Sequence, residues 1–231
     1  MMNLDRSLAI TGIIVSAMGV LFCLGKFSFG WILFISGLLL CLYAVRKIYS
    51  ASPVTKISRS HLYEFKDPAA SIVESTRIGV YQINAKNVTM LRARCISATG
   101  ELKKFRTNVG TLKIDEASGG GLCVRVDLDR PPKPRSELTW ILSFEGHNCF
   151  AEKHESVSYT ALEKWENGTL SIRFHPDRFP QIVKKTLYSG GKETVLEEVS
   201  LTKELPSIDW DFKPKRGEDY LLQWTWPDVS D

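Results

Sequence analysis

Two long apolar runs in the first 50 residues constrain this chain more than any other feature. The runs extend from Leu8 to Gly25 and from Phe27 to Val45, with Lys26 between them. A bilayer core of roughly 30 Å requires about 20 apolar helical residues, within a range of about 17–25. Neither run contains Asp, Glu, Lys, Arg or His. The sequence therefore predicts a two-helix transmembrane hairpin over residues 1–50.

Two alternatives explain the apolar runs less well. A cleaved signal peptide has one short apolar region and a small-residue cleavage site before a mature domain. Here a second apolar run follows the first directly. A hairpin buried in a soluble core would show a polar stripe at helical spacing, and neither run has one.

The positive charges near the runs predict the orientation of the hairpin. Lysine and arginine concentrate on the cytoplasmic side of membrane proteins. The turn between the runs carries only Lys26, whereas the outer ends carry Arg6, Arg46, Lys47, Lys56 and Arg59. We therefore expect a multi-pass protein of the cell inner membrane with both termini in the cytoplasm.

Small residues predict where the two helices pack. They lie on one face of each run, at Gly12, Ser16, Gly19, Ser36 and Gly37. Such residues let helix backbones approach closely in lipid. Two helices without ionisable residues cannot form a transport path in a monomer, so any pore requires a homo-oligomer within the lipid bilayer.

The remainder of the chain is nearly neutral. The whole chain has 30 Lys+Arg against 26 Asp+Glu, and residues 1–50 hold four of the former and one of the latter. The resulting net charge of +1 argues against a broad nucleic-acid surface. Five cysteines without a CxxC pair predict neither a disulfide framework nor a zinc site.

Alternating apolar residues predict strands after a linker over residues 51–77. Clear examples are Leu122 to Leu128, Leu138 to Phe144, Leu170 to Phe174 and Tyr220 to Trp226. Asn167-Gly168 and Gly190-Gly191 are hairpin signals. The pattern indicates about nine or ten strands, and so an all-β cytoplasmic domain over 78–231, an antiparallel sandwich or barrel. Five tryptophans at mostly inward positions predict core packing: Trp140, Trp165, Trp210, Trp224 and Trp226.

No catalytic constellation can be assembled from the sequence. The segment GHNCFAEKHE brings together His147, Cys149, His154 and Glu155, but their spacing matches no closed zinc pattern. G-x-S-x-G and H-E-x-x-H motifs are absent. We therefore expect a protein that is not an enzyme and needs no cofactor or metal.

A basic cluster is the best candidate for ligand binding. It lies on two consecutive predicted strands, MLRARCI and ELKKFRT, and contains Arg92, Arg94, Lys103, Lys104 and Arg106. Residues two apart share a strand face, so a turn at Thr99-Gly100 would place the two sets opposite each other. Guanidinium groups on a rigid sheet suit phosphate, and a solvated strand face is the alternative.

The layout of the whole chain resembles a class of bacterial antiphage defence effectors, which act by abortive infection. The class includes retron-associated transmembrane effectors and the two-helix, β-strand-rich effectors of CBASS systems. The resemblance implies that the β domain receives an infection signal and that the helices then disrupt the inner membrane. The regulator would be a reverse transcriptase–nucleic acid complex in the first case and a cyclic oligonucleotide in the second. The length of the β domain favours the retron type, and no binding residue can be carried over.

Two other functions compete with this expectation. A membrane-anchored β-sandwich can act as a scaffold or regulatory module without a pore. A membrane-tethered enzyme is the other alternative, and the absence of a recognisable catalytic motif argues against it.

Overall fold

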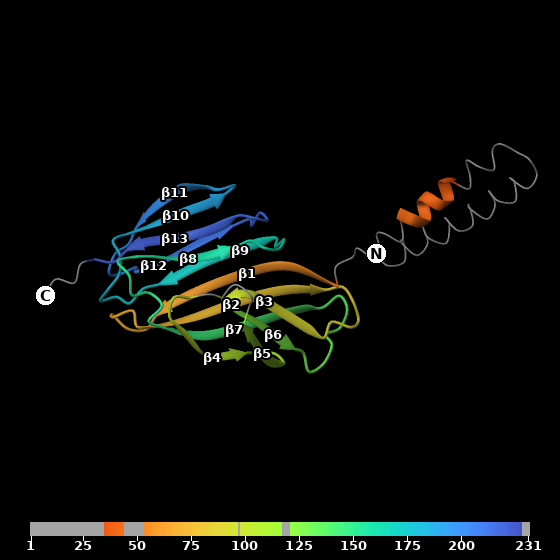
Figure 1. Cartoon of the computed structure of the whole chain (residues 1–231), viewed down its shortest axis with the longest axis horizontal. Helices are drawn as coiled ribbons and strands as arrows, with labels where there is room; N and C mark the ends of the chain where they lie inside the picture. Colours follow the sequence, from red (N-terminus) through yellow and green to blue (C-terminus); the bar gives the residue numbers. More distant parts are fainter. Residues whose placement is uncertain (1–34, 44–52, 97, 117–120, 228–231) are drawn as a thin grey trace, which may run out of the picture. The chain divides into compact units, whose positions relative to one another are not determined.

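The chain forms two compact units, Met1–Ser52 and Pro53–Asp231. The computed structural model describes residues 35–43, 53–96, 98–116 and 121–227, with Arg94 and Cys95 described by their backbone alone. The described part of the first unit is one helix, residues 35–43. The thirteen strands of the described chain all belong to the second unit (Figure 1).

The predicted two-helix transmembrane hairpin is not supported. The described helical residues are 35–43, fewer than the roughly 20 that a bilayer core requires. No helix in the described ranges is long and apolar enough to cross a membrane. This finding contradicts the predicted fold class and the predicted multi-pass inner-membrane location. The apolar pattern indicates removal from water, but it does not determine how far a helix continues.

Most residues assigned to the hairpin lie outside the described ranges. Ser36 and Gly37 lie in the helix at 35–43. The others are outside: the span ends Leu8, Gly25, Phe27 and Val45, and the packing residues Gly12, Ser16 and Gly19.

A six-stranded mixed sheet forms one layer of the second unit. Its strands, in spatial order, are β12 (Ser207–Phe212), β9 (Asn167–Arg173), β1 (Val54–Phe65), β2 (Ile72–Ile83), β7 (Glu137–His147) and β4 (Glu101–Thr107). The pair β1–β9 is parallel, and the other neighbours are antiparallel.

Two smaller antiparallel sheets form the opposite layer. One contains β11 (Lys192–Ser200), β10 (Ile182–Ser189), β13 (Asp219–Thr225) and β8 (His154–Thr160), in that order. The other contains β3 (Met90–Ile96), β6 (Leu122–Asp127) and β5 (Thr111–Glu116). Strands β8 and β3 are therefore edge strands of their sheets.

Each small sheet packs on a different part of the same face of the large sheet. Leu170, Ile172 and Trp210 of the large sheet share a core with Val157 and Leu222 of the four-stranded sheet. Tyr81, Trp140 and Leu142 share a second core with Val124 and Val126 of the three-stranded sheet. The two cores bury the five predicted core tryptophans, each with a side chain at most 9% exposed.

The hairpin predictions had mixed outcomes. Gly190-Gly191 joins β10 to β11 in an antiparallel hairpin, as predicted. The hairpin predicted at Asn167-Gly168 is wrong, because these residues begin β9, which pairs in parallel with β1. A parallel pair requires a crossover between its strands, so local turn chemistry does not report it.

Residues 51–77, expected to be a linker, contain β1 and the first half of β2. These strands lie at the centre of the large sheet. Alternate residues of a strand point to the same face, so the odd-numbered residues of β1 and β2, from Arg59 to Phe65 and from Val73 to Ile83, face the two small sheets together.

Candidate functional site

A cavity of about 750 Å³ lies between the layers of the sandwich. Most of its lining comes from β1, β2 and β7 of the large sheet and from the edge strands β3 and β8 of the two small sheets. Leu102 of β4 and segments between the strands complete it. The cavity therefore lies between the large sheet and the edge strands β3 and β8 of the second layer. Its size is within the usual range of small-molecule sites.

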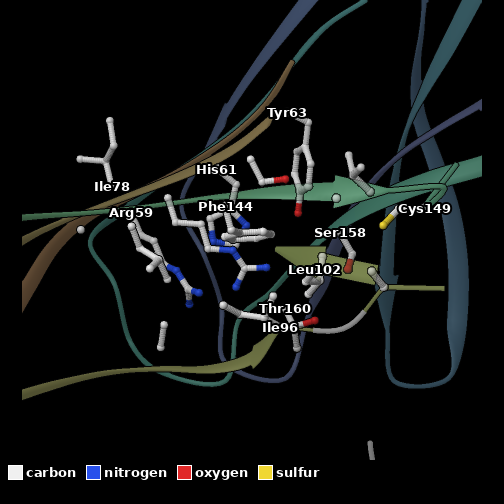
Figure 2. Close-up of a pocket in the computed structure, with 18 of the residues that line it drawn as sticks. Arg59, His61, Tyr63, Ile78, Ile96, Leu102, Phe144, Cys149, Ser158 and Thr160 are labelled. Atoms are coloured by element: carbon white, nitrogen blue, oxygen red, sulfur yellow. The ribbon is translucent and has the colours of Figure 1, made fainter. Parts of the chain in front are cut away.

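Three basic side chains form part of the cavity lining on the large sheet. Arg59 and His61 are two apart on β1, so they point to the same side. Arg77 on β2 pairs directly opposite His61 in the antiparallel register. All three line the cavity, and Figure 2 shows Arg59 and His61 directed into it beside Phe144.

Aromatic rings hold the two guanidinium groups. The Arg59 guanidinium lies 5.4 Å from the ring centroid of Tyr159 and 5.9 Å from that of Trp165. The Arg77 guanidinium lies 5.5 Å from the ring centroid of Phe144. Cation–π contacts of this kind fix the position of a guanidinium without neutralising its charge.

His61 is the most unusual side chain of the cavity. It is 3% exposed, and its ring centroid lies 5.0 Å from that of Tyr159. Neither ring nitrogen has a hydrogen-bond partner among the described residues. Burial, and then the charges of Arg59 and Arg77, hold the pKa of His61 well below its usual 6.5. The carbonyl of Ser158 opposes this effect, but its geometry does not make a hydrogen bond. The ring is therefore neutral near pH 7.

Two more buried donors lie beside this group. The Tyr159 hydroxyl and the Trp165 Nε1–H have no hydrogen-bond partner within the described chain. Burial raises the pKa of Tyr159 to about 12, so its hydroxyl keeps its proton. An indole N–H and guanidinium N–H groups can only donate. Of these two residues, Trp165 lines the cavity and Tyr159 does not.

The acidic residues of the lining do not cancel the arginines. They are Glu155 and Glu163, against Arg59, Arg77 and Arg92. Glu163 forms an ion pair with Lys56. Glu155 accepts a 2.7 Å hydrogen bond from the backbone N–H of Glu152, and burial raises its pKa. The lining keeps a positive excess.

This arrangement suits an anion with an organic body. Forked guanidinium groups bind carboxylate and phosphate oxygens through charged hydrogen bonds. The apolar part of the lining includes Trp140, Leu142 and Phe144. No group of three or more His, Cys, Asp and Glu residues in the described ranges is arranged to hold a metal ion.

The structure separates the basic residues that the sequence analysis placed together. Strand β3 pairs with β6, whereas β4 pairs with β7, so the two do not form a hairpin. Arg92 on β3 lines the cavity and is exposed. Arg94 is on the same strand, where the backbone alone is described.

The residues of the predicted basic cluster on β4 are Lys103, Lys104 and Arg106, and β4 is an edge strand of the large sheet. Lys103 pairs with Glu101 at 2.7 Å and Lys104 with Glu145 at 2.9 Å. Arg106 is exposed. None of the three lines the cavity.

The sequence analysis missed the principal candidates, Arg59, His61 and Arg77. Arg59 was counted as a charge flanking a membrane helix, and all three residues fall within the expected linker. One sequence feature could have revealed them. Arg59, His61, Tyr63 and Phe65 occupy every second position, and this spacing places side chains on one face of a strand.

The histidines of the segment GHNCFAEKHE are engaged separately. His147 lies 3.1 Å from Glu145, and His154 lies 2.9 Å from the Thr225 hydroxyl. The buried Cys149 faces the backbone oxygens of Glu101 and His147.

The comparisons with known proteins give only distant likenesses. No family model matches the chain, and no curated protein matches it. A structure of yeast LTA4 hydrolase in complex with bestatin is 7% identical, with a TM-score of 0.43 over 74% of this chain and 28% of that one. An M1 zinc metallopeptidase from Deinococcus radiodurans is 8% identical, with a TM-score of 0.37 over 76% of this chain and 39% of that one. The chain thus spans well under half the length of these proteins, and likenesses at this level carry no argument about its activity.

Proposed function

We propose that the unit Pro53–Asp231 is a receptor domain that binds a small organic anion in the cavity between its sheets and does not transform it. The observation that carries the proposal is the buried imidazole of His61, which has no hydrogen-bond partner in the described ranges and which lies within the electrostatic reach of Arg59 and Arg77. An anion bound beside His61 would accept a hydrogen bond from the ring N–H, which has no acceptor within the described chain.

The energetics of the empty cavity support this proposal. A buried polar group without a hydrogen bond costs about 1–3 kcal/mol, and His61 has two such nitrogens. Side chains that reduce stability in this way concentrate at functional sites. A ligand oxygen that accepts from the one N–H of the neutral ring would recover part of this cost, and that gain would add to its affinity.

The proposed role corresponds to the signal-receiving part of the effector function that the sequence led us to expect. In an antiphage effector, the β domain would receive the signal, and the cavity offers a place for an anionic signal molecule. The regulator could equally be delivered by a partner complex. We do not retain membrane disruption in the proposal, since it depended on two spanning helices.

Calorimetry with the purified full chain tests the proposal. The probes are inorganic phosphate, phenyl phosphate, adenosine monophosphate and a cyclic dinucleotide. We expect at least one organic anion to bind and to raise the melting temperature, as a ligand of the folded state must. Arg59→Gln should weaken binding about tenfold or more, because it removes a charged hydrogen-bond donor.

Arg216→Gln is the matched control, because Arg216 is exposed and does not line the cavity. It should bind as the wild-type protein does. The proposal fails if no organic anion of the panel binds, or if Arg59→Gln and Arg216→Gln have equal affinities.

A further inference from the structure

The backbone edge of strand β8 is a second binding feature of the cavity. We infer that this edge takes up an extended peptide segment of another protein as an added strand, with an acidic side chain of the segment directed at Arg59. The inference goes beyond the proposed function, because it concerns the unpaired backbone of β8 and an interaction with a polypeptide.

The hydrogen-bond register identifies the backbone groups of β8 that point away from β13. The Trp226 N–H donates to the Lys153 carbonyl, and the Ala161 N–H donates to the Glu218 carbonyl. Both bonds continue the register in which β8 pairs with β13. Hydrogen-bonded pairs alternate along an antiparallel ladder, so the odd-numbered residues of β8 are the ones that bond to β13. The even-numbered residues, whose backbone groups point to the free edge, include Ser156, Ser158 and Thr160.

The free edge of β8 faces the cavity. Ser156, Ser158 and Thr160 all line it, the last two as labelled in Figure 2. Their side chains are nevertheless exposed, whereas Val157 and Tyr159 are buried against the large sheet. Since side chains alternate between the two faces of a strand, the three lining residues present their backbone edge to the cavity.

Most of these edge groups have no hydrogen-bond partner in the part of the chain that the structure describes. The Thr160 carbonyl accepts a 3.0 Å hydrogen bond from the Leu162 N–H. The N–H groups of Ser156, Ser158 and Thr160 and the carbonyls of the two serines have no partner among the described residues. A row of unpaired strand groups is what an added strand pairs with.

Strand β8 differs in this respect from β11, the other edge strand of its sheet. The pairing of β10 with β11 shifts register between Lys185 and Thr186, and two glutamates of β11 form ion pairs with lysines of β10. Bulges and charged side chains hinder the addition of further strands. The pairing of β8 with β13 runs in one register over seven pairs, and the residues from Ser156 to Thr160 are uncharged. The free edge of β8 is therefore open to strand addition.

The surroundings of the edge specify the chemistry of the peptide. A strand rises about 3.3 Å per residue, so the edge from Ser156 to Thr160 accommodates about five residues, with alternate side chains facing the large sheet. On that sheet the Arg59 guanidinium lies 5.4 Å from the ring centroid of Tyr159, a residue of β8, so an acidic side chain matches it by charge. Phe144 lines the same side of the cavity and suits an apolar side chain. The structure thus favours a segment with an acidic residue and a large apolar residue two positions apart.

Calorimetry with the full chain measures peptide binding. The probes are acetylated and amidated pentapeptides of the sequence Thr-Glu-Thr-X-Thr, in which X is valine, leucine, phenylalanine or tyrosine. We expect at least one of them to bind with a Kd below about 1 mM. In the tightest binder, N-methylation of single amides should weaken binding at least about tenfold at alternate positions and about twofold or less at the positions between them. Only every second N–H of an added strand points to β8, so this alternation is the signature of strand addition.

A proline at position 158 tests the protein side of the same pairing. Ser158→Pro removes one donor of the free edge and no bond to β13, and edge strands tolerate proline at such positions. It should weaken peptide binding at least about tenfold. Ser158→Ala is the matched control, because it keeps the N–H, and it should bind within about twofold of the wild-type protein. The melting temperature of each variant checks that it is folded.

The possible outcomes separate this inference from the proposed function. Failure of all four peptides to bind overturns the inference, whether or not an organic anion binds. Peptide binding without alternation in the N-methyl series also overturns it, and this comparison uses the wild-type protein, so it holds even if Ser158→Pro does not fold. A folded Ser158→Pro with unchanged affinity has the same consequence. Peptide binding with alternation, in a protein that binds no organic anion of the earlier panel, overturns the proposed function and leaves this inference standing.

Discussion

At the scale of single residues, His61 combines a cost to stability with a use in binding. The ring is buried, its nitrogens have no hydrogen-bond partners within the described chain, and two arginines oppose its protonation. Replacing such a group with an apolar side chain of similar size is often neutral or stabilising, because no desolvated polar atom remains.

We predict that His61→Leu increases the free energy of unfolding by about 1–2 kcal/mol near neutral pH. The same variant should lose anion binding. Urea denaturation measures the stability, and His154→Leu, at an exposed position, is the control for loss of an imidazole as such. A decrease in stability would show that His61 makes a structural contribution that its contacts do not reveal.

The pH dependence of stability provides a second test of His61. Its pKa in the folded protein lies well below 6.5, the value of a free imidazole. As the pH falls below about 6.5, the unfolded chain takes up a proton that the folded chain does not, so stability falls by up to about 1.4 kcal/mol per pH unit. This loss ends once the pH is below the pKa of the folded state.

Denaturation at about pH 7.5 and pH 5.5 should show this loss in the wild-type protein and a smaller loss in His61→Leu. Carboxylates with lowered pKa values, such as Asp67, lose their contribution at lower pH, so they do not account for the difference. Parallel pH profiles for the two proteins would contradict the assignment of a neutral His61.

At the scale of secondary-structure elements, the β10–β11 hairpin depends on the backbone of its turn. Gly190 and Gly191 have φ values of 59° and 80°, and Ser189 pairs with Lys192 across the turn. Two residues with positive φ are what a two-residue type I′ turn requires. A Cβ at either glycine would meet no atom within 4 Å, so the backbone conformation alone decides the cost of a substitution.

We predict that Gly191→Val destabilises the hairpin by about 1–2 kcal/mol, because a β-branched residue resists positive φ. Gly190→Asn should be nearly neutral, since asparagine tolerates this conformation. Amide hydrogen exchange of β11 measures the effect directly, because β11 is an edge strand that can open locally. Unchanged protection of β11 in Gly191→Val would show that the turn does not determine this pairing.

At the scale of the whole molecule, the second unit has the cores that it needs to fold alone. Both hydrophobic cores consist of residues between Val54 and Trp226, and the unit Pro53–Asp231 is compact by itself. The cavity is lined by the large sheet and by the edge strands β3 and β8 of the two small sheets.

We predict that a fragment of residues 53–231 folds as a β-rich domain and unfolds in one cooperative transition, since its cores share strands of the large sheet. Circular dichroism and urea denaturation measure both properties. The fragment should bind the same anion as the full chain, with an affinity within about twofold. A fragment that is unfolded, or that unfolds in two separate steps, would contradict this prediction.

The sequence by itself determined the features that depend on neighbours in the chain. Alternation located the inward residues of β6, β7, β9 and β13, because a strand places every second side chain on one face. The Gly190-Gly191 turn was equally local, since its residue types match the φ values that the turn requires. The same pattern located the buried Trp140 on β7 and Trp224 on β13, whereas the buried Trp165 lies outside the strands.

The tertiary structure alone decided the features that depend on distant pairing. One such feature is the parallel contact of β1 with β9. Two others are the placement of β3 and β4 in different sheets and the division of the second layer into two sheets. All three depend on pairing between segments that are far apart in the sequence. The cavity arises from that division, so Arg59, His61 and Arg77 form a site only after β1, β2 and the two edge strands are placed. A strand pattern specifies which side chains point inward, but not which strand lies opposite, and for that physical reason the sequence did not reveal the site.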